Sequence, residues 1–411
     1  MIGSDFSSRS ESKMPDLVQD APSAVLEHGV FLDHHATTPL DGRVLEAMLP
    51  YYGAQFGNPH SVGYARAEMS RVAVEKARWQ VAQLIGAEPE DIIFTAGATE
   101  ACNLALRGLF EPREKAAKGK PVPRLLYSAI EHSCVRETAH ALQAEGVEAL
   151  ELPVDADGLI DLDVVEDRLA CGAIVTSVMA ANNEVGTLQP LSDLAALCHL
   201  HGCLFHTDAA QAVGKVPLDV RATGIDLLSL SGHKLYGPQG IGALYCSAGA
   251  RRRLRPVVFG GGQERGLRPG TLPLALCVGL GEACRIAAQE MAAEARRLSH
   301  LRDALLERLR HAIPQLTVNG SLDQRLPGNL NVSLPGVEAD ALVLALGDVA
   351  ISTGSACASG ALAPSHVLEA LGADPRRAQS AIRIGLGRFT TQNDVIRGAD
   401  RIIEVAQKLV A

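Results

Sequence analysis

The chain has 411 residues, of which 47% are hydrophobic and 21% charged, a composition typical of a globular protein with two or three packing units. Acidic residues outnumber basic ones by 47 to 38, and the net charge of −9 argues against a basic nucleic-acid-binding surface over the whole molecule. The apolar runs are all shorter than the ~18 residues that a membrane-spanning helix needs. We therefore expect neither a direct nucleic-acid partner nor a membrane partner.

The first 24 residues are polar and lack the apolar segment of a secretory signal. We interpret residues 1–24 as a disordered or frayed tail. Nine cysteines are spread along the chain without any CxxC pair. This odd number and this spacing argue against a disulfide framework and against a structural metal site. A reducing cytoplasm is the expected location.

From about residue 90, short β-rich runs alternate with helical patterns. This alternation predicts an α/β unit with a mostly parallel central sheet flanked by helices. The expected strands are 92–96, 124–128, 173–179, 203–207, 227–230 and 242–246, and the expected helices are 99–109, 133–145 and 192–201.

After residue 273 the pattern changes. Leucines recur near a period of 3.6 residues across 287–311, which predicts a long amphipathic helix. Further strands are expected at 330–334, 350–352 and 381–385, and a last helix at 393–409. These elements indicate a second, smaller α/β domain. In α/β proteins, ligands bind at the carboxyl ends of parallel strands and between domains.

Three expected strand ends carry polar or small residues that suit a phosphorylated ligand. Asp208 follows one buried strand, and a buried carboxylate needs a positive partner unless it simply caps the next helix. Lys234 follows another in a glycine-rich loop, where it is either a Schiff-base amine or a solvated turn residue. Residues 97–99 lead into a helix, which offers free N–H groups to a phosphate or forms an ordinary turn.

This set of groups favours pyridoxal phosphate, which is mounted on a lysine with an acid opposite its ring nitrogen. The chain has neither GxxxxGK[ST] nor a GxGxxG that follows a strand, so the common nucleotide-binding loops are disfavoured. The adjacent His34 and His35 form a weak metal candidate, because neighbouring side chains on a strand face opposite ways.

The chain resembles the cysteine desulfurases of the IscS/NifS-like (type I) branch, within the class V aminotransferase family of pyridoxal-phosphate enzymes. The resemblance runs from about residue 31 to 389 and implies a fold-type I structure. It implies a large cofactor-binding domain at 40–285 and a small domain formed by 25–39 and 286–411. The motifs that carry it are LDHHATTP at 32–39, FGNPHS at 56–61, GATEACN at 97–103, EHSCV at 131–135, NNEVG at 182–186, HTDAAQ at 206–211, SGHKLYGPQGIGALY at 231–245, GGGQERGLRPGT at 260–271, STGSAC at 352–357 and IRIGLGRFT at 382–390.

The resemblance implies a role for each residue that would face the cofactor ring. Lys234 would bond to the cofactor as a Schiff base, and Asp208 would pair with the ring nitrogen. His132 would stack on the ring and assist proton transfer. Gln211 would bond to the ring oxygen, and Asn183 would help to place the substrate.

The resemblance also implies how the phosphate is held. The four groups expected from the same chain are Ala98, Thr99, Ser231 and His233. Thr271 would reach the phosphate of the partner subunit, which implies a homodimer.

Two residues would act on the substrate, L-cysteine. Arg383 would bind its carboxylate with a planar guanidinium. Cys357, in a run of small residues, would attack its sulfur and carry it as a persulfide to an acceptor protein of iron–sulfur cluster assembly or of thiolation. The alternatives are a selenocysteine lyase, a class V aminotransferase or a non-catalytic sulfur-carrier scaffold. An intact set of Lys234, Asp208, His132 and Cys357 argues against the scaffold.

Overall fold

The computed structural model describes residues 29–110, 122–353 and 365–410 of the chain. Its larger sheet has seven strands in the order β2-β8-β7-β6-β5-β3-β4. Only β8 runs against its neighbours, so the sheet is mostly parallel, as expected. The strands are β2 (Ile92–Thr95), β3 (Arg124–Ser128), β4 (Glu148–Leu152), β5 (Val175–Ser177), β6 (Leu204–Asp208), β7 (Leu227–Ser231) and β8 (Gly242–Cys246).

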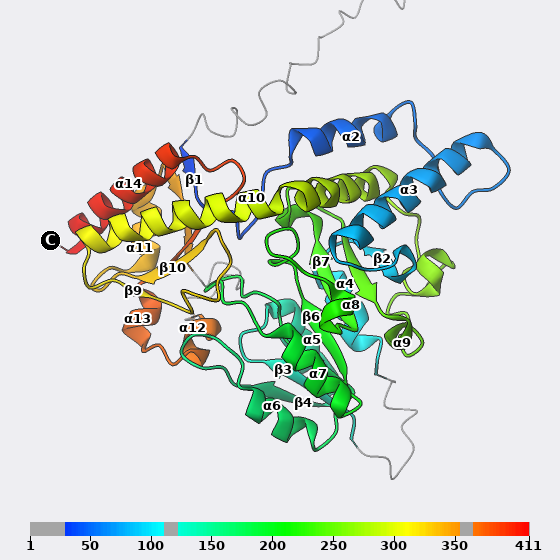
Figure 1. The fold of residues 1–411 in the computed structure, drawn as a ribbon, viewed down its shortest axis with the longest axis horizontal. Helices are drawn as coiled ribbons and strands as arrows, with labels where there is room; N and C mark the ends of the chain where they lie inside the picture. The colour runs from blue at the N-terminus through cyan, green and yellow to red at the C-terminus, as the bar shows by residue number, and fades with distance from the viewer. Residues whose placement is uncertain (1–28, 111–121, 354–364, 411) are drawn as a thin grey trace, which may run out of the picture.

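Helices cover both faces of this sheet (Figure 1). Successive strand residues point to opposite faces, so Leu125 and Leu126 enter different hydrophobic clusters. One cluster includes α4 (Ala98–Arg107) and α5 (Ser133–Ala144). The other includes α2 (Gly42–Tyr52), α3 (Ala65–Leu84), α6 (Leu162–Leu169), α7 (Leu191–Leu200) and the first part of α10 (Leu274–Ala312).

The smaller sheet has four strands in the order β12-β13-β10-β9, and all of its neighbouring pairs are antiparallel. A separate cluster of buried residues joins this sheet to three helices. The elements are β9 (Thr317–Val318), β10 (Asn329–Ser333), β12 (Ser352–Thr353) and β13 (Ala381–Gly385), with α10, α11 (Ala339–Leu346) and α14 (Gln392–Val410). A parallel pair, β1 (Val30–Phe31) with β11 (Val349–Ala350), lies beside them.

Helix α10 crosses from one part of the molecule to the other (Figure 1). Its first half packs with the larger sheet through residues such as Leu280, and its second half packs with the smaller sheet through Leu305. The expected boundary at residue 285 therefore falls inside one continuous helix. Gly281 permits the close approach of α3, because a Cβ there would lie 2.6 Å from the Cα of Ala77.

Most expected strands are observed within two residues of their predicted bounds. The strand expected at 350–352 is instead two short strands, β11 and β12, with Ile351 between them. Within the described residues, no helix combines the length and the apolarity needed to cross a membrane.

Candidate active site

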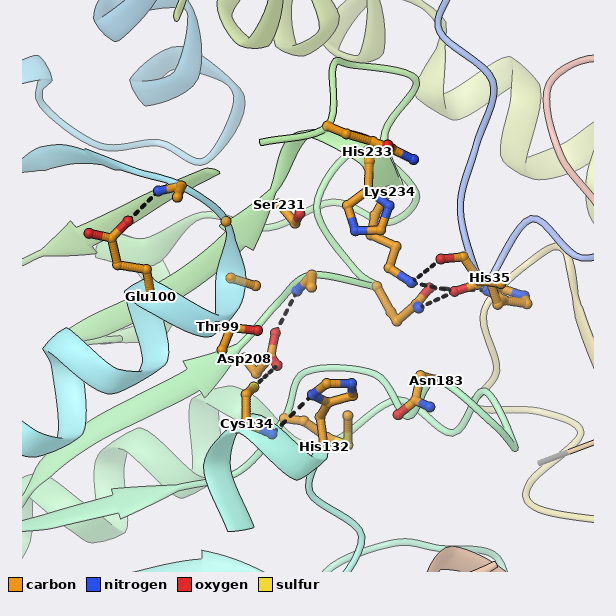
Figure 2. Close-up of a pocket in the computed structure, with 18 of the residues that line it drawn as sticks. His35, Thr99, Glu100, His132, Cys134, Asn183, Asp208, Ser231, His233 and Lys234 are labelled. Carbon is orange, nitrogen blue, oxygen red and sulfur yellow. Dashed lines mark hydrogen bonds between the residues drawn. The ribbon is translucent and has the colours of Figure 1, made fainter. Parts of the chain in front are cut away.

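A cavity of about 750 Å³ lies at the carboxyl ends of the parallel strands. Nine of the residues predicted for the site line it: Ala98, Thr99, His132, Asn183, Asp208, Gln211, Ser231, His233 and Lys234. They come from the ends of five different strands and from the loops and helix starts that follow them, and Figure 2 shows those that it labels around one space. Fold topology therefore brings together residues that are more than 130 positions apart in the sequence.

The α4 N-terminus forms one wall of the cavity. Helix α4 begins at Ala98, directly after Gly97, and its first N–H groups have no partner within the helix. Ser231 and His233 line the same cavity from the end of β7. Gly242, the first residue of β8, lies so close to Gly97 that no side chain fits there, because a Cβ at 242 would lie 2.7 Å from the Cα of Gly97. Helix N–H groups with nearby hydroxyl and imidazole groups suit an anion.

Lys234 extends from the end of β7 toward the loop after β1. Its Nζ donates hydrogen bonds to the carbonyl oxygens of His35, at 2.6 Å, and Ala36, at 2.7 Å (Figure 2). Next to it, burial and then the charges of Lys234 and Lys215 lower the pKa of His233 to about 4. His233 is consequently neutral near pH 7, and its Nδ1 lies 3.0 Å from the Thr37 hydroxyl.

Asp208 ends strand β6 and is only 4% exposed. Its Oδ1 accepts a hydrogen bond from the Ala210 N–H at 2.9 Å, and its Oδ2 accepts one from the Cys134 thiol at 3.8 Å. A buried carboxylate is costly without a positive partner. The arrangement therefore suits a cationic N–H group inside the cavity.

His132 is the N-cap of α5, and its Nδ1 accepts a hydrogen bond from the Cys134 N–H at 3.2 Å. A neutral imidazole that accepts at Nδ1 carries its proton at Nε2. The cap thus fixes both the direction of the ring and the nitrogen that can donate a proton.

A second layer of polar groups supports Gln211. Its Oε1 accepts a hydrogen bond from Lys215 Nζ at 2.9 Å and lies 3.1 Å from His35 Nδ1, while its Nε2 donates to the His35 carbonyl. Burial lowers the pKa of Lys215 to about 7. Lys215 was not predicted from the sequence, and His35 was considered only as a metal ligand. Neither residue directly follows an expected strand, so the sequence offered no signal for this second layer.

Two of the predicted residues lie elsewhere. Arg383 is 1% exposed and does not line the cavity; its Nη1 donates to the Asn183 carbonyl at 3.0 Å, and its Nη2 donates to Asp33 at 2.8 Å. Thr271 is exposed and also outside the cavity. Cys357 lies outside the described residues.

Known proteins are similar to this chain in sequence and in fold. Residues 30–397 match the family described as aminotransferase class-V. The cysteine desulfurase IscS of Rickettsia bellii is 46% identical over 380 residues, which are 92% of each chain. The chain belongs to the class-V aminotransferase family, among its cysteine desulfurases.

Solved structures of this family have the same architecture. A NifS-like protein, 35% identical, superposes with a TM-score of 0.85 over 92% of this chain and 100% of its own. A structure described as SspA in complex with cysteine is 36% identical, with a TM-score of 0.75 over 87% of this chain and 98% of its own. The expected fold, an α/β pyridoxal-phosphate enzyme, is confirmed.

The cofactor of class-V aminotransferases is pyridoxal phosphate, and the donor set of the cavity fits it. The buried Asp208 carboxylate suits a protonated ring nitrogen, because its two hydrogen bonds from protein groups come from uncharged donors. The α4 N-terminus and Ser231 suit the phosphate, and the Lys234 amine suits the aldehyde.

Proposed function

We propose that this chain removes sulfur from L-cysteine with the help of pyridoxal phosphate, releases L-alanine and first receives the sulfur on Cys357. The observation that carries the proposal is the assembly of Lys234, Asp208 and His132 around one cavity beside a helix N-terminus. When bound, pyridoxal phosphate supplies an electron sink for the bond that breaks at the amino-acid Cα.

In this proposal, the residues of the chain position the reactants and move protons. The Lys234 amine takes the proton from the substrate Cα, and the carbonyls of His35 and Ala36 set its direction of approach. Asp208 balances the positive charge of the ring nitrogen. His132 is oriented by its hydrogen bond from the Cys134 N–H, and it donates a proton from Nε2.

Sulfur transfer is assigned to Cys357. Its thiolate attacks the substrate Sγ, the Cβ–Sγ bond breaks, and Cβ gains a proton, so that one cysteine and one thiol yield one alanine and one persulfide. Both flanks of residues 354–364 support this assignment. Ser352 donates to Asp33, which also binds Arg383, and Ser365 donates to Glu184, next to Asn183 in the cavity wall.

Substrate binding by Arg383 is proposed in a modified form. The guanidinium is buried, and two of its nitrogens already bind Asp33 and the Asn183 carbonyl. Its Nε has no hydrogen-bond partner. Arg383 therefore acts in one of two ways: it binds the substrate carboxylate after these contacts rearrange, or it holds Asn183 in position. Measurement of both KM and kcat for cysteine in Arg383→Lys tests this role.

Product analysis tests the proposed reaction. L-Cysteine with a reductant should yield alanine and sulfide in equal amounts, and Cys357→Ala should keep the bound cofactor but lose sulfide release. The matched control is Cys171→Ala, because Cys171 is an exposed free thiol. Full sulfide release by Cys357→Ala would refute the role of Cys357.

A homodimer is part of the proposal. Thr271 is exposed and outside the cavity of its own chain, as a residue that serves a partner must be. Large apolar side chains such as Phe259, 85% exposed, and Trp79, 51% exposed, are available for an interface. Sedimentation should give twice the chain mass, and Thr271→Ala should weaken cofactor binding. A monomer with normal cofactor affinity would contradict this.

We also propose that the sulfur passes to an acceptor protein of iron–sulfur cluster assembly or thiolation in the cytoplasm. The eight cysteines in the described part of the chain are free, as expected in a reducing compartment. Sulfur transfer to a purified scaffold or thiolation protein, followed by mass spectrometry of that acceptor, tests the pathway.

A further inference from the structure

Two thiols lie close to the Asp208 carboxylate, and one of them, Cys134, lines the cavity. Cys102 comes from α4, Cys134 from the first turn of α5, and Asp208 from the end of β6. The two Sγ atoms and a carboxylate oxygen all lie within 4.8 Å of one another. Cys102 is 0% exposed and Cys134 8%. Figure 2 shows Cys134 pointing at Asp208.

We infer that Cys102, Cys134 and Asp208 form a binding site for a divalent ion that prefers sulfur ligands, such as Zn²⁺, in the cofactor-free chain. Zinc takes sulfur at ~2.3 Å and oxygen at ~2.0–2.2 Å in a tetrahedron, which places neighbouring ligand atoms roughly 3.5–3.8 Å apart. The Cys134 Sγ and Asp208 Oδ2 are already 3.8 Å apart. The widest pair, at most 4.8 Å apart, needs to close by about 1 Å.

The surroundings suit such an ion. The N-terminus of α5, a helix of 12 residues, favours the thiolate form of Cys134. Cys134 and Asp208 line the cavity, so an ion can enter from it, and a water molecule can take the fourth position. Three protein ligands with one open position are typical of accessible zinc sites.

The ion and pyridoxal phosphate should exclude each other. This part of the inference rests on the proposed function, because it requires that Asp208 faces the ring nitrogen of the cofactor. Zinc on the carboxylate would offset the negative charge that stabilises a protonated ring nitrogen, so the two cations should compete for Asp208. Zinc would thus hold the chain in an inactive, cofactor-free form.

Zinc titration of the full chain tests the site. The background carries Cys171→Ser and Cys357→Ser, so that neither the exposed thiol nor the proposed nucleophile competes for the ion. After removal of the cofactor, calorimetry should show one Zn²⁺ per chain. Cys102→Ala and Cys134→Ala should each weaken binding by more than about tenfold. Cys284→Ala, equally buried but in α10, should leave it unchanged.

X-ray absorption of the zinc-loaded chain provides a measurement that needs no variant at the site. Two sulfur ligands at ~2.3 Å are expected, and a shell of nitrogen and oxygen alone would overturn the site. Unchanged zinc affinity in both cysteine variants would do the same.

Cofactor rebinding separates the two parts of the inference. Zinc should slow the return of the yellow cofactor absorbance, and this effect should disappear in Cys134→Ala. If zinc is held by two sulfurs yet the cofactor rebinds equally fast, the metal site stands, and the competition between zinc and the cofactor is refuted.

Discussion

Glu184 links the cavity wall to the far end of the segment that carries Cys357. Its side chain is 4% exposed. Its Oε2 accepts a hydrogen bond at 2.5 Å from Ser365, the N-cap of helix α12 (His366–Ala370). Burial raises the pKa of Glu184 from 4.5 to about 7, although the Ser365 hydroxyl and the charge of Arg383 oppose the shift. The folded chain should therefore hold a proton on Glu184 over a pH range in which the unfolded chain has lost it.

The sign and size of the effect follow from proton linkage. The raised pKa stabilises the fold fully below pH 4.5, and this stabilisation is lost as the pH rises from 4.5 through about 7. One pKa unit corresponds to about 1.4 kcal/mol, so the total is on the order of 3 kcal/mol. Glu184→Gln removes the titration and retains the shape and an acceptor for Ser365.

Urea unfolding of both proteins between pH 4.5 and pH 8 measures the effect. The free energy of unfolding of Glu184→Gln, minus that of the wild type, should rise by up to about 3 kcal/mol across this range and then level off. Other titrating groups cancel in this difference. A difference that stays constant with pH would refute the assignment of a buried, protonated carboxyl to Glu184.

Three substitutions test the roles of Lys234, Asp208 and Arg78. Lys234→Ala should abolish the absorbance of the lysine-linked cofactor, and a spectrum like that of the wild type would contradict its role. Asp208→Asn should weaken cofactor binding about tenfold, because a neutral hydrogen bond replaces a charged one worth about 1.5 kcal/mol more; an unchanged dissociation constant would place the ring nitrogen elsewhere. Arg78→Met should lower the free energy of unfolding by about 3–5 kcal/mol, because it leaves the Glu264 carboxylate, whose side chain is 2% exposed and which lies 2.7 Å from Arg78, without its cation. In urea unfolding, the double variant Arg78→Met/Glu264→Gln should regain part of the free energy of unfolding that Arg78→Met loses. If the single and the double variant lose the same amount, Arg78 and Glu264 do not form a buried ion pair.

Six of the seven strands of the larger sheet were predictable because they are short and mostly buried, whereas β4 was missed, because only Leu152 of its five residues is buried. All five residues of β8 and four of five in β3 are buried, so most of their residues are apolar. The start of α10 at Leu274 was missed. Residues 274–286 pack against α2 and α3 and are mostly buried, so they lack the one-sided pattern that revealed the second half.

The cavity residues were predictable as strand ends, but their second layer was not. Lys215 bonds to Gln211 only because one turn of chain separates them after β6. The contact of Cys102 with Cys134 and Asp208 depends on how α4 and α5 pack over the sheet. Sequence spacing does not encode contacts between separate helices, and the absence of CxxC pairs concealed the proposed metal site.

Mass spectrometry can detect the capture of sulfur by Cys357 directly. The enzyme with bound cofactor is mixed with one equivalent of L-cysteine without reductant, quenched with an alkylating agent and digested. The peptide that contains Cys357 should be heavier by one sulfur atom, with one alanine formed per modified chain. Alanine formed while Cys357 stays an unmodified thiol, or sulfur found on Cys171 instead, would contradict the account.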